Sequence, residues 1–183
     1  MNKMSKPLII LGSSRSHGNT RKVLDRLIEL HACDLIDLND WQFSYYDYEH
    51  KNRDDDFIKI IDQLLNYDIV IFASPIYWYS MSGVMKTFFD RISDLLKIRK
   101  EKGRQLRGKT MLAISCNGDQ EDYPSFAAPF ELSADYLGMN YAGYYHAWIE
   151  NGEIAPATEI KLKQLAADLV SLQSRQETES SKS

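Results

Sequence analysis

Cysteine is scarce in this sequence, which has only Cys33 and Cys116 among its 183 residues. Two thiols cannot build a disulfide framework or a four-cysteine metal site. The sequence also lacks a long hydrophobic run. The apolar segment Pro7–Leu11 that follows the basic N-terminus is too short for a signal-peptide core or a membrane span. We therefore expect a protein of the reducing cytoplasm that has no membrane partner.

Positive charge is not in excess either. The chain has 22 Lys and Arg against 26 Asp and Glu, a net charge of −4, which argues against nucleic acid as a partner. Apolar residues make up 44% of the chain, enough for a full hydrophobic core. The length fits a single domain, and the polar, serine-rich end is typical of disorder. We expect one domain over residues 1–175 and a disordered tail over residues 176–183.

Short apolar runs alternate with amphipathic segments along the chain. The runs are typical of strands buried on both faces, and apolar residues three and four apart are typical of helices. The expected strands are Pro7–Leu11, Cys33–Leu38, Asp68–Ala73, Thr110–Ser115 and Tyr141–Ile149, and helices are expected to begin near Asn19, Asp56, Met81, Ser125 and Ala157. Ser74-Pro75 is expected to end the third strand, and residues 39–56 to form a long loop. This alternation predicts an α/β fold with a doubly wound parallel sheet and helices on both faces.

Ligands of such sheets bind beyond the carboxyl ends of the strands, which directs attention to the loops over residues 12–20, 74–82 and 116–124. The first of these, Gly12–Thr20, joins a strand to a helix and contains two glycines, four hydroxyl residues and Arg15. Backbone N–H groups at a helix N-terminus and hydroxyl donors suit a phosphate. The spacing is neither that of a Walker A loop nor G-x-G-x-x-G. An ordinary polar turn that caps the helix is the alternative.

The second loop carries three consecutive aromatic residues, Tyr77, Trp78 and Tyr79. Aromatic side chains at a binding edge are costly to leave in water. A flat heteroaromatic ligand could cover them by stacking, and so could a second subunit.

Other candidate sites carry weaker signals. The four histidines do not have the spacing of metal ligands. Cys116 follows a strand but lacks the arginine spacing of a cysteine phosphatase loop, so we expect a small buried thiol.

Taken together, the loops resemble those of the NAD(P)H-dependent FMN reductases of the flavodoxin-like superfamily, particularly the branch that contains the iron–sulfur flavoproteins. Gly12–Thr20 resembles the FMN-phosphate loop of that branch, and residues 74–78 with Ser82-Gly83 resemble its isoalloxazine loop. Residues 118–121, followed by Leu137-Gly138-Met139, resemble the stretch after the fourth strand. The resemblance covers residues 6–150 and implies a flavodoxin-like sandwich with five parallel strands in the order 2-1-3-4-5.

The resemblance also implies the cofactor-binding residues. The FMN phosphate would be held by Ser13, Arg15, Gly18, Asn19 and Thr20, the ring would pack along Pro75, Ile76, Tyr77 and Trp78, and its pyrimidine end would lie near Asn117 and Gly118. Because the flavin carries the redox chemistry, no catalytic side chain is assigned.

The loop after the second strand departs from the iron–sulfur branch. Residues 39–56 contain Trp41, Phe43, Tyr45, Tyr46 and Tyr48 but no cysteine. A cluster cannot form without thiolate ligands, so we expect FMN without an iron–sulfur cluster. Asn117-Gly118-Asp119 is also poorer in glycine than the corresponding loop of the family.

Three functions are compatible with this site. A flavodoxin-like one-electron carrier would bind the same FMN without oxidising NAD(P)H, and a flavin-free module of the same fold would bind no FMN. The resemblance favours the third, an enzyme that passes a hydride from NAD(P)H through FMN to a small acceptor such as a flavin or a quinone. It also implies a homodimer or homotetramer.

Overall fold

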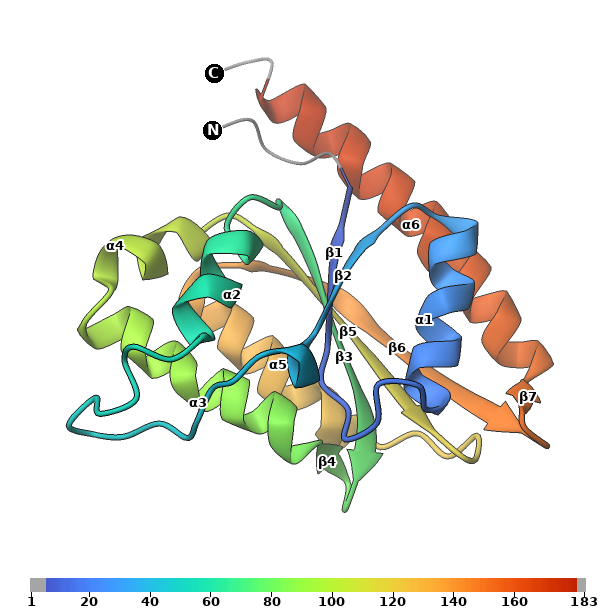
Figure 1. Cartoon of the computed structure of the whole chain (residues 1–183). Coiled ribbons are helices and arrows are strands. Elements are labelled where there is room, and N and C mark those ends of the chain that lie inside the picture. Colours follow the sequence, from blue (N-terminus) through green and yellow to red (C-terminus); the bar gives the residue numbers. More distant parts are fainter. Residues whose placement is uncertain (1–5, 181–183) are drawn as a thin grey trace.

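A central sheet with helices on both sides forms the computed structural model, which describes residues 6–180 (Figure 1). The parallel strands are β1 (Leu8–Leu11), β2 (Asp34–Asp37), β3 (Ile69–Tyr77), β5 (Thr110–Asn117) and β6 (Asn140–Glu150). The helices are α1 (Asn19–Leu30), α2 (Phe57–Leu64), α3 (Gly83–Lys97), α4 (Lys100–Gly103), α5 (Pro124–Leu137) and α6 (Pro156–Ser180), with short 3-10 helices η1 (Leu38–Asp40) and η2 (Arg104–Leu106). None of the helices within residues 6–180 is long and apolar enough to cross a membrane.

The parallel strands lie in the order β2-β1-β3-β5-β6. When the parallel strands alone are numbered along the chain, this is the predicted order 2-1-3-4-5. Two short antiparallel strands extend the sheet: β4 (Ser80–Met81) pairs with the end of β3, and β7 (Glu153–Ile154) pairs with the end of β6. The sheet therefore has seven strands rather than the expected five, because a two-residue strand is too short to show a hydrophobic period.

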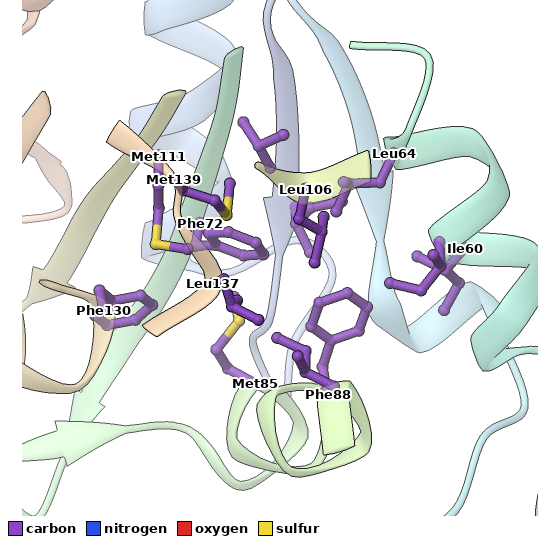
Figure 2. Packing of buried hydrophobic residues seen from close by; sticks show 14 of the residues in the cluster. Ile60, Leu64, Phe72, Met85, Phe88, Leu106, Met111, Phe130, Leu137 and Met139 are labelled. Atoms are coloured by element: carbon purple, nitrogen blue, oxygen red, sulfur yellow. The ribbon is translucent and has the colours of Figure 1, made fainter. Parts of the chain in front are cut away.

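The two faces of the sheet carry separate hydrophobic cores. Ile9 and Leu11 of β1 pack with α1 and α6, whereas Leu8 and Ile10 point to the side of α2, α3 and α5. Figure 1 shows the same division of the helices. The second core is rich in aromatic residues, and Figure 2 shows Phe88 of α3 beside Phe72 of β3, with 6.0 Å between the ring centroids. Burial on both faces explains why the strands are continuous apolar runs.

Strand β3 does not end at Ser74-Pro75 as expected but continues to Tyr77. Its pairing with β1 stops at Leu11↔Ala73, while its pairing with β5 continues to Pro75↔Cys116. At Ser74 and Pro75, β3 therefore pairs with β5 alone, before β4 pairs with Ile76 and Tyr77. A proline without an N–H group is tolerated at such an edge.

The C-terminal segment is helical where we expected disorder. Helix α6 continues to Ser180, which corrects the expectation for residues 176–180, while residues 181–183 lie outside the described residues. Near its end, the Gln176 amide donates to the Asp68 carbonyl at 3.4 Å and to the Thr110 hydroxyl at 3.3 Å. These contacts attach the polar end of the helix to the strand starts, which composition alone does not reveal.

Arg91 of α3 holds the long loop over residues 41–56 against the domain. The side chain is fully buried, and each of its five N–H donors has a partner. These are the Ser44 and Asn52 carbonyl oxygens, both oxygens of Asp55, and Asp94. Asp55 also accepts from the N–H of Phe57 at the start of α2. Asp55 therefore joins the start of α2 to the buried guanidinium of Arg91.

Replacing Arg91 with leucine should strongly destabilise the protein. The substitution leaves the Asp94 carboxylate, which is 4% exposed, without its buried cation. We expect a loss of about 3–5 kcal/mol in the free energy of unfolding, as for other broken buried pairs, measured by urea denaturation. Arg21→Leu is the control, because Arg21 pairs with Asp25 on the surface and should cost at most about 1 kcal/mol. Equal losses in the two variants would contradict this role of Arg91.

Candidate functional site

A cleft of about 560 Å³ opens at the carboxyl edge of the sheet, where the loops after β1, β3 and β5 meet. This edge is at the bottom of Figure 1. The cleft is lined by Ser13, Ser14, Arg15, His17, Gly18, Asn19, Thr20, Lys22, Pro75, Ile76, Tyr77, Cys116, Asn117 and Gly118. All of the predicted cofactor-binding residues except Trp78 are in this lining. Its volume is in the usual range for a small-molecule site.

The first wall of the cleft is the N-terminus of α1. The helix begins at Asn19 as predicted, and its cap residue, Gly18, has no side chain that could bond to the first N–H groups. The first N–H groups of a helix have no partner inside the helix and form its positive end. This wall therefore presents backbone donors that can bind an anion.

Basic side chains surround the same end of the cleft. Arg15 is exposed, and within residues 6–180 its guanidinium donates no hydrogen bond. Lys22 donates to the Gly152 carbonyl at 2.9 Å, and His17 also lies in the lining. Neither His17 nor Lys22 was among the site residues predicted from the sequence. The spacing of Lys22 from Asn19, one helical turn, could have identified it as a residue on the same helix face.

The second wall comes from the end of β3. Pro75 is buried, Ile76 is half-buried and Tyr77 is exposed. The Tyr77 and Ser14 hydroxyl oxygens are 2.8 Å apart, so this wall is joined to the first loop. Pro75 and Ile76 give the cleft an apolar part in addition to the polar helix start.

Trp78 does not line the cleft. Trp78 and Tyr79 form the two-residue turn between β3 and β4, with φ values of 50° and 65°. The left-handed backbone directs Trp78 outward, and its side chain is 92% exposed. Coverage of this side chain by a second subunit stays a prediction.

The third wall is the end of β5. The Asn117 amide donates to Asp119 at 3.1 Å and to the Glu121 carbonyl at 3.3 Å, so this side chain orders its own loop. Next to it, Gly118 has open space where a Cβ would lie. The backbone at residue 118 is therefore accessible from the cleft.

Cys116 contributes a neutral thiol to the cleft. Burial raises the pKa of the Cys116 thiol to about 12, although a hydrogen bond with Thr20 acts in the opposite direction. A thiol with this pKa is not a nucleophile at neutral pH. The expectation of a small buried thiol is confirmed, but its position in the cleft was not foreseen. Within residues 6–180, no group of three or more His, Cys, Asp or Glu side chains could hold a metal ion.

Gly12 and Ser82 hold the first two walls together. The Ser82 hydroxyl donates to the Gly12 carbonyl at 2.7 Å and accepts from the Met85 N–H at 3.2 Å. The Ser82 N–H donates to the Ser74 hydroxyl at 2.9 Å. One buried serine thus caps α3 and attaches it to the ends of β1 and β3.

A second hollow of about 380 Å³ lies between α3 and α5, with apolar side chains such as Phe89 and Leu132 in its lining. It contains none of the predicted site residues and lies away from the carboxyl ends of the strands. The cleft is therefore the better candidate for a cofactor site.

Comparisons with known proteins find relatives by sequence and by structure. The profile of a family described as NADPH-dependent FMN reductase matches residues 5–153. The chain is 30% identical over 149 residues to YwqN of Bacillus subtilis (strain 168), whose assigned name is that of an NAD(P)H-dependent FMN-containing oxidoreductase. The match covers 76% of this chain and 82% of that protein.

Solved structures show the same fold. The structure described as Trp repressor binding protein from Bacillus subtilis has a TM-score of 0.70 and 28% identity, with 87% of this chain and 97% of that chain covered. FerB from Paracoccus denitrificans, described as a flavoenzyme NAD(P)H:(acceptor) oxidoreductase, has a TM-score of 0.71 at 15% identity. That match covers 93% of this chain and 97% of the other.

A side chain at position 12 should disrupt the junction of the walls. In Gly12→Ala, the new Cβ would lie 2.7 Å from the Met85 Cβ and 3.1 Å from its Cα. The backbone of α3 would have to move, and we expect a loss of about 1–3 kcal/mol, as for other overpacked sites. Urea denaturation measures it.

Gly83→Ala is the matched control, because nothing lies within 4 Å of a Cβ at that position. Alanine also favours a helix more than glycine does, so this variant should be neutral or more stable. Unchanged stability in Gly12→Ala would show that α3 can shift away from β1.

Proposed function

The chain belongs to the NADPH-dependent FMN reductase family, a family of flavin-dependent NAD(P)H oxidoreductases, and from this we propose that it transfers a hydride from NAD(P)H through FMN bound in the cleft to a small acceptor. The observation that supports the site most directly is the cleft itself, whose lining contains both the N-terminus of α1 and the apolar end of β3. A flavin mononucleotide has the matching polarity, since one end is a phosphate and the other a flat ring. When bound, FMN would supply the hydride-accepting chemistry.

The polar end of the cleft has the donors that a phosphate requires. Backbone N–H groups of Asn19 and Thr20 are at the start of α1, and Arg15 has no competing partner among the described residues. Ser13 is buried, and its hydroxyl accepts from the Arg15 N–H at 3.3 Å, so its own proton is available to an anion. We propose that these residues bind the FMN phosphate.

The apolar end suits a flat aromatic ring. Pro75, Ile76 and Tyr77 would pack along one side of it, and backbone groups near Gly118 would face its pyrimidine end. Backbone donors at that position would stabilise negative charge on the reduced ring. Because the Asn117 amide is already bonded within its loop, we assign the contact to the backbone of Asn117 and Gly118.

Removing the Arg15 guanidinium should weaken the binding of FMN and leave the binding of riboflavin unaffected, because only FMN carries the phosphate. A charge-assisted hydrogen bond contributes about 1.5–3 kcal/mol. Arg15→Ala should therefore lower the affinity for FMN by about tenfold or more, measured by quenching of flavin fluorescence. FMN affinity should also fall as the pH drops through the second pKa of the phosphate, about 6.

Arg21→Ala is the matched control. Arg21 is also in the first turns of α1, but it pairs with Asp25 and is absent from the cleft lining. The control should bind FMN almost as the wild type does. If Arg15→Ala lowers the affinities for FMN and for riboflavin equally, the phosphate lies elsewhere.

Anaerobic stopped-flow mixing tests the hydride transfer itself. We expect NADPH or NADH to bleach the flavin absorbance of the FMN-loaded protein, and a quinone or free flavin to restore it. If the flavin stays oxidised in excess NADPH and excess NADH, the hydride transfer is contradicted and a one-electron carrier of the same fold is favoured.

A further inference from the structure

A chain of polar side chains ties the sheet to the loop over residues 118–123, here called the β5–α5 loop. The His146 Nε2 atom is 3.3 Å from the Asp119 carbonyl oxygen, and its Nδ1 atom is 2.7 Å from the Ser115 hydroxyl. The Ser115 hydroxyl is 2.7 Å from the Tyr144 hydroxyl, which donates to the Asp122 carboxylate at 2.8 Å. Both ends of this hydrogen-bonded network are in the β5–α5 loop, and its middle residues are on β5 and β6.

The protons in this network do not suffice for its contacts. The two ends, the Asp119 carbonyl and the ionised Asp122 carboxylate, can only accept. Between them, a neutral His146 and the hydroxyls of Ser115 and Tyr144 carry one proton each. Four contacts therefore share three protons, and one contact places two lone pairs against each other. A fourth proton, on the imidazole, would satisfy all four.

The surroundings of His146 leave this proton unbound at neutral pH. The ring is 2% exposed and stacks on Trp148 with 5.7 Å between the centroids. Burial lowers the pKa of His146 from its ordinary value, and Lys161 acts in the same direction, while Asp119 and Asp122 oppose them. Lys161 comes from α6 and donates to the His146 carbonyl at 3.2 Å.

We propose that Ser115, Tyr144 and His146 are positioning residues for flavin binding, which hold the β5–α5 loop at the cleft and do so fully only when the network carries its fourth proton. The proposal rests on the proposed function, because Gly118 connects this loop to the cleft wall. Two attachment points, at Asp119 and Asp122, restrain the loop just beyond the residue that faces the ring. A loop held in this way loses less conformational entropy when the ligand binds.

The direction of the pH effect follows from the proton count. The ordered loop favours flavin binding, and it also favours binding of the fourth proton. Proton binding and flavin binding therefore promote each other. Flavin affinity should then rise as the pH falls. The phosphate of FMN has the opposite effect, so riboflavin, which lacks it, isolates the contribution of the loop.

Riboflavin affinity should therefore be measured from about pH 8 down to about pH 5, well below the ordinary histidine pKa of about 6.5, because burial lowers the pKa of His146. In the wild type we expect it to rise by about three- to tenfold across this range, the worth of one hydrogen bond. Asp122→Asn is the decisive variant, because its amide can donate to Tyr144 and so supply the missing proton at every pH. It should bind at pH 8 as the wild type does at pH 5, with a flat profile.

Tyr144→Phe cuts the network, and Tyr145→Phe is its matched control. Tyr145 is the next residue of β6, and its hydroxyl also donates to an aspartate, Asp168 of α6, on the opposite face of the sheet. We expect Tyr144→Phe to bind riboflavin about three- to tenfold more weakly than the control at pH 5, with little pH dependence. Loss of a packing contact alone would weaken binding equally at all pH values.

Hydrogen exchange of the flavin-free protein gives a second measurement. At pH 8, amides of residues 118–123 should exchange more slowly in Asp122→Asn than in the wild type. The proposal would be overturned if these amides exchange equally fast in Asp122→Asn and the wild type, or if the riboflavin affinities of these two proteins have parallel pH profiles. Equal riboflavin affinities of Tyr144→Phe and Tyr145→Phe would overturn it as well. A wild type that binds neither FMN nor riboflavin would contradict the proposed function itself, whereas tight binding with a flat profile contradicts only the network.

Discussion

Helix α3 begins in direct contact with the end of β1, and the geometry of the cleft depends on this contact. Gly12 has no side chain to separate the two, and its carbonyl accepts the hydroxyl proton of Ser82, the residue that caps α3. The N–H of Gly12 is in turn bonded to Ala73 of β3 at 2.8 Å. The loops after β1 and β3 therefore start from one buried point. A shift of α3 would change the width of the cleft between them.

The three loops also hold one another around the cleft. Ser14 bonds to Tyr77, the Tyr79 ring meets the Tyr123 ring edge-on at 5.1 Å, and Thr20 bonds to the Cys116 thiol. Each wall is thereby attached to the other two by contacts within the protein. Preorganisation of this kind reduces the entropy lost on binding. It suits a protein whose task is to position a cofactor that supplies the reactive atoms.

The sequence predicts the parts of the fold that depend on local pattern. The buried run before Gly12 and the helix start at Asn19 lie where we expected them, because both follow from neighbouring residues. Arg91 could not be found in this way. A lone arginine on an amphipathic helix is usually solvated, and its five partners are 3 to 47 positions away in the chain. The network of His146 was missed for the same reason, since it spans two strands and a loop.

The family resemblance placed Trp78 along the flavin ring, whereas the backbone conformation at Trp78 explains where its side chain lies. A two-residue turn between antiparallel strands requires left-handed residues, usually Asn-Gly, and each non-glycine residue there costs about 1–3 kcal/mol. The short turn is retained because it returns the chain within reach of Ser74 and Gly12, so that Ser82 can cap α3. The strain at Trp78 and Tyr79 is thus offset by the junction that forms the cleft. The exposed indole of Trp78 is the consequence of that geometry.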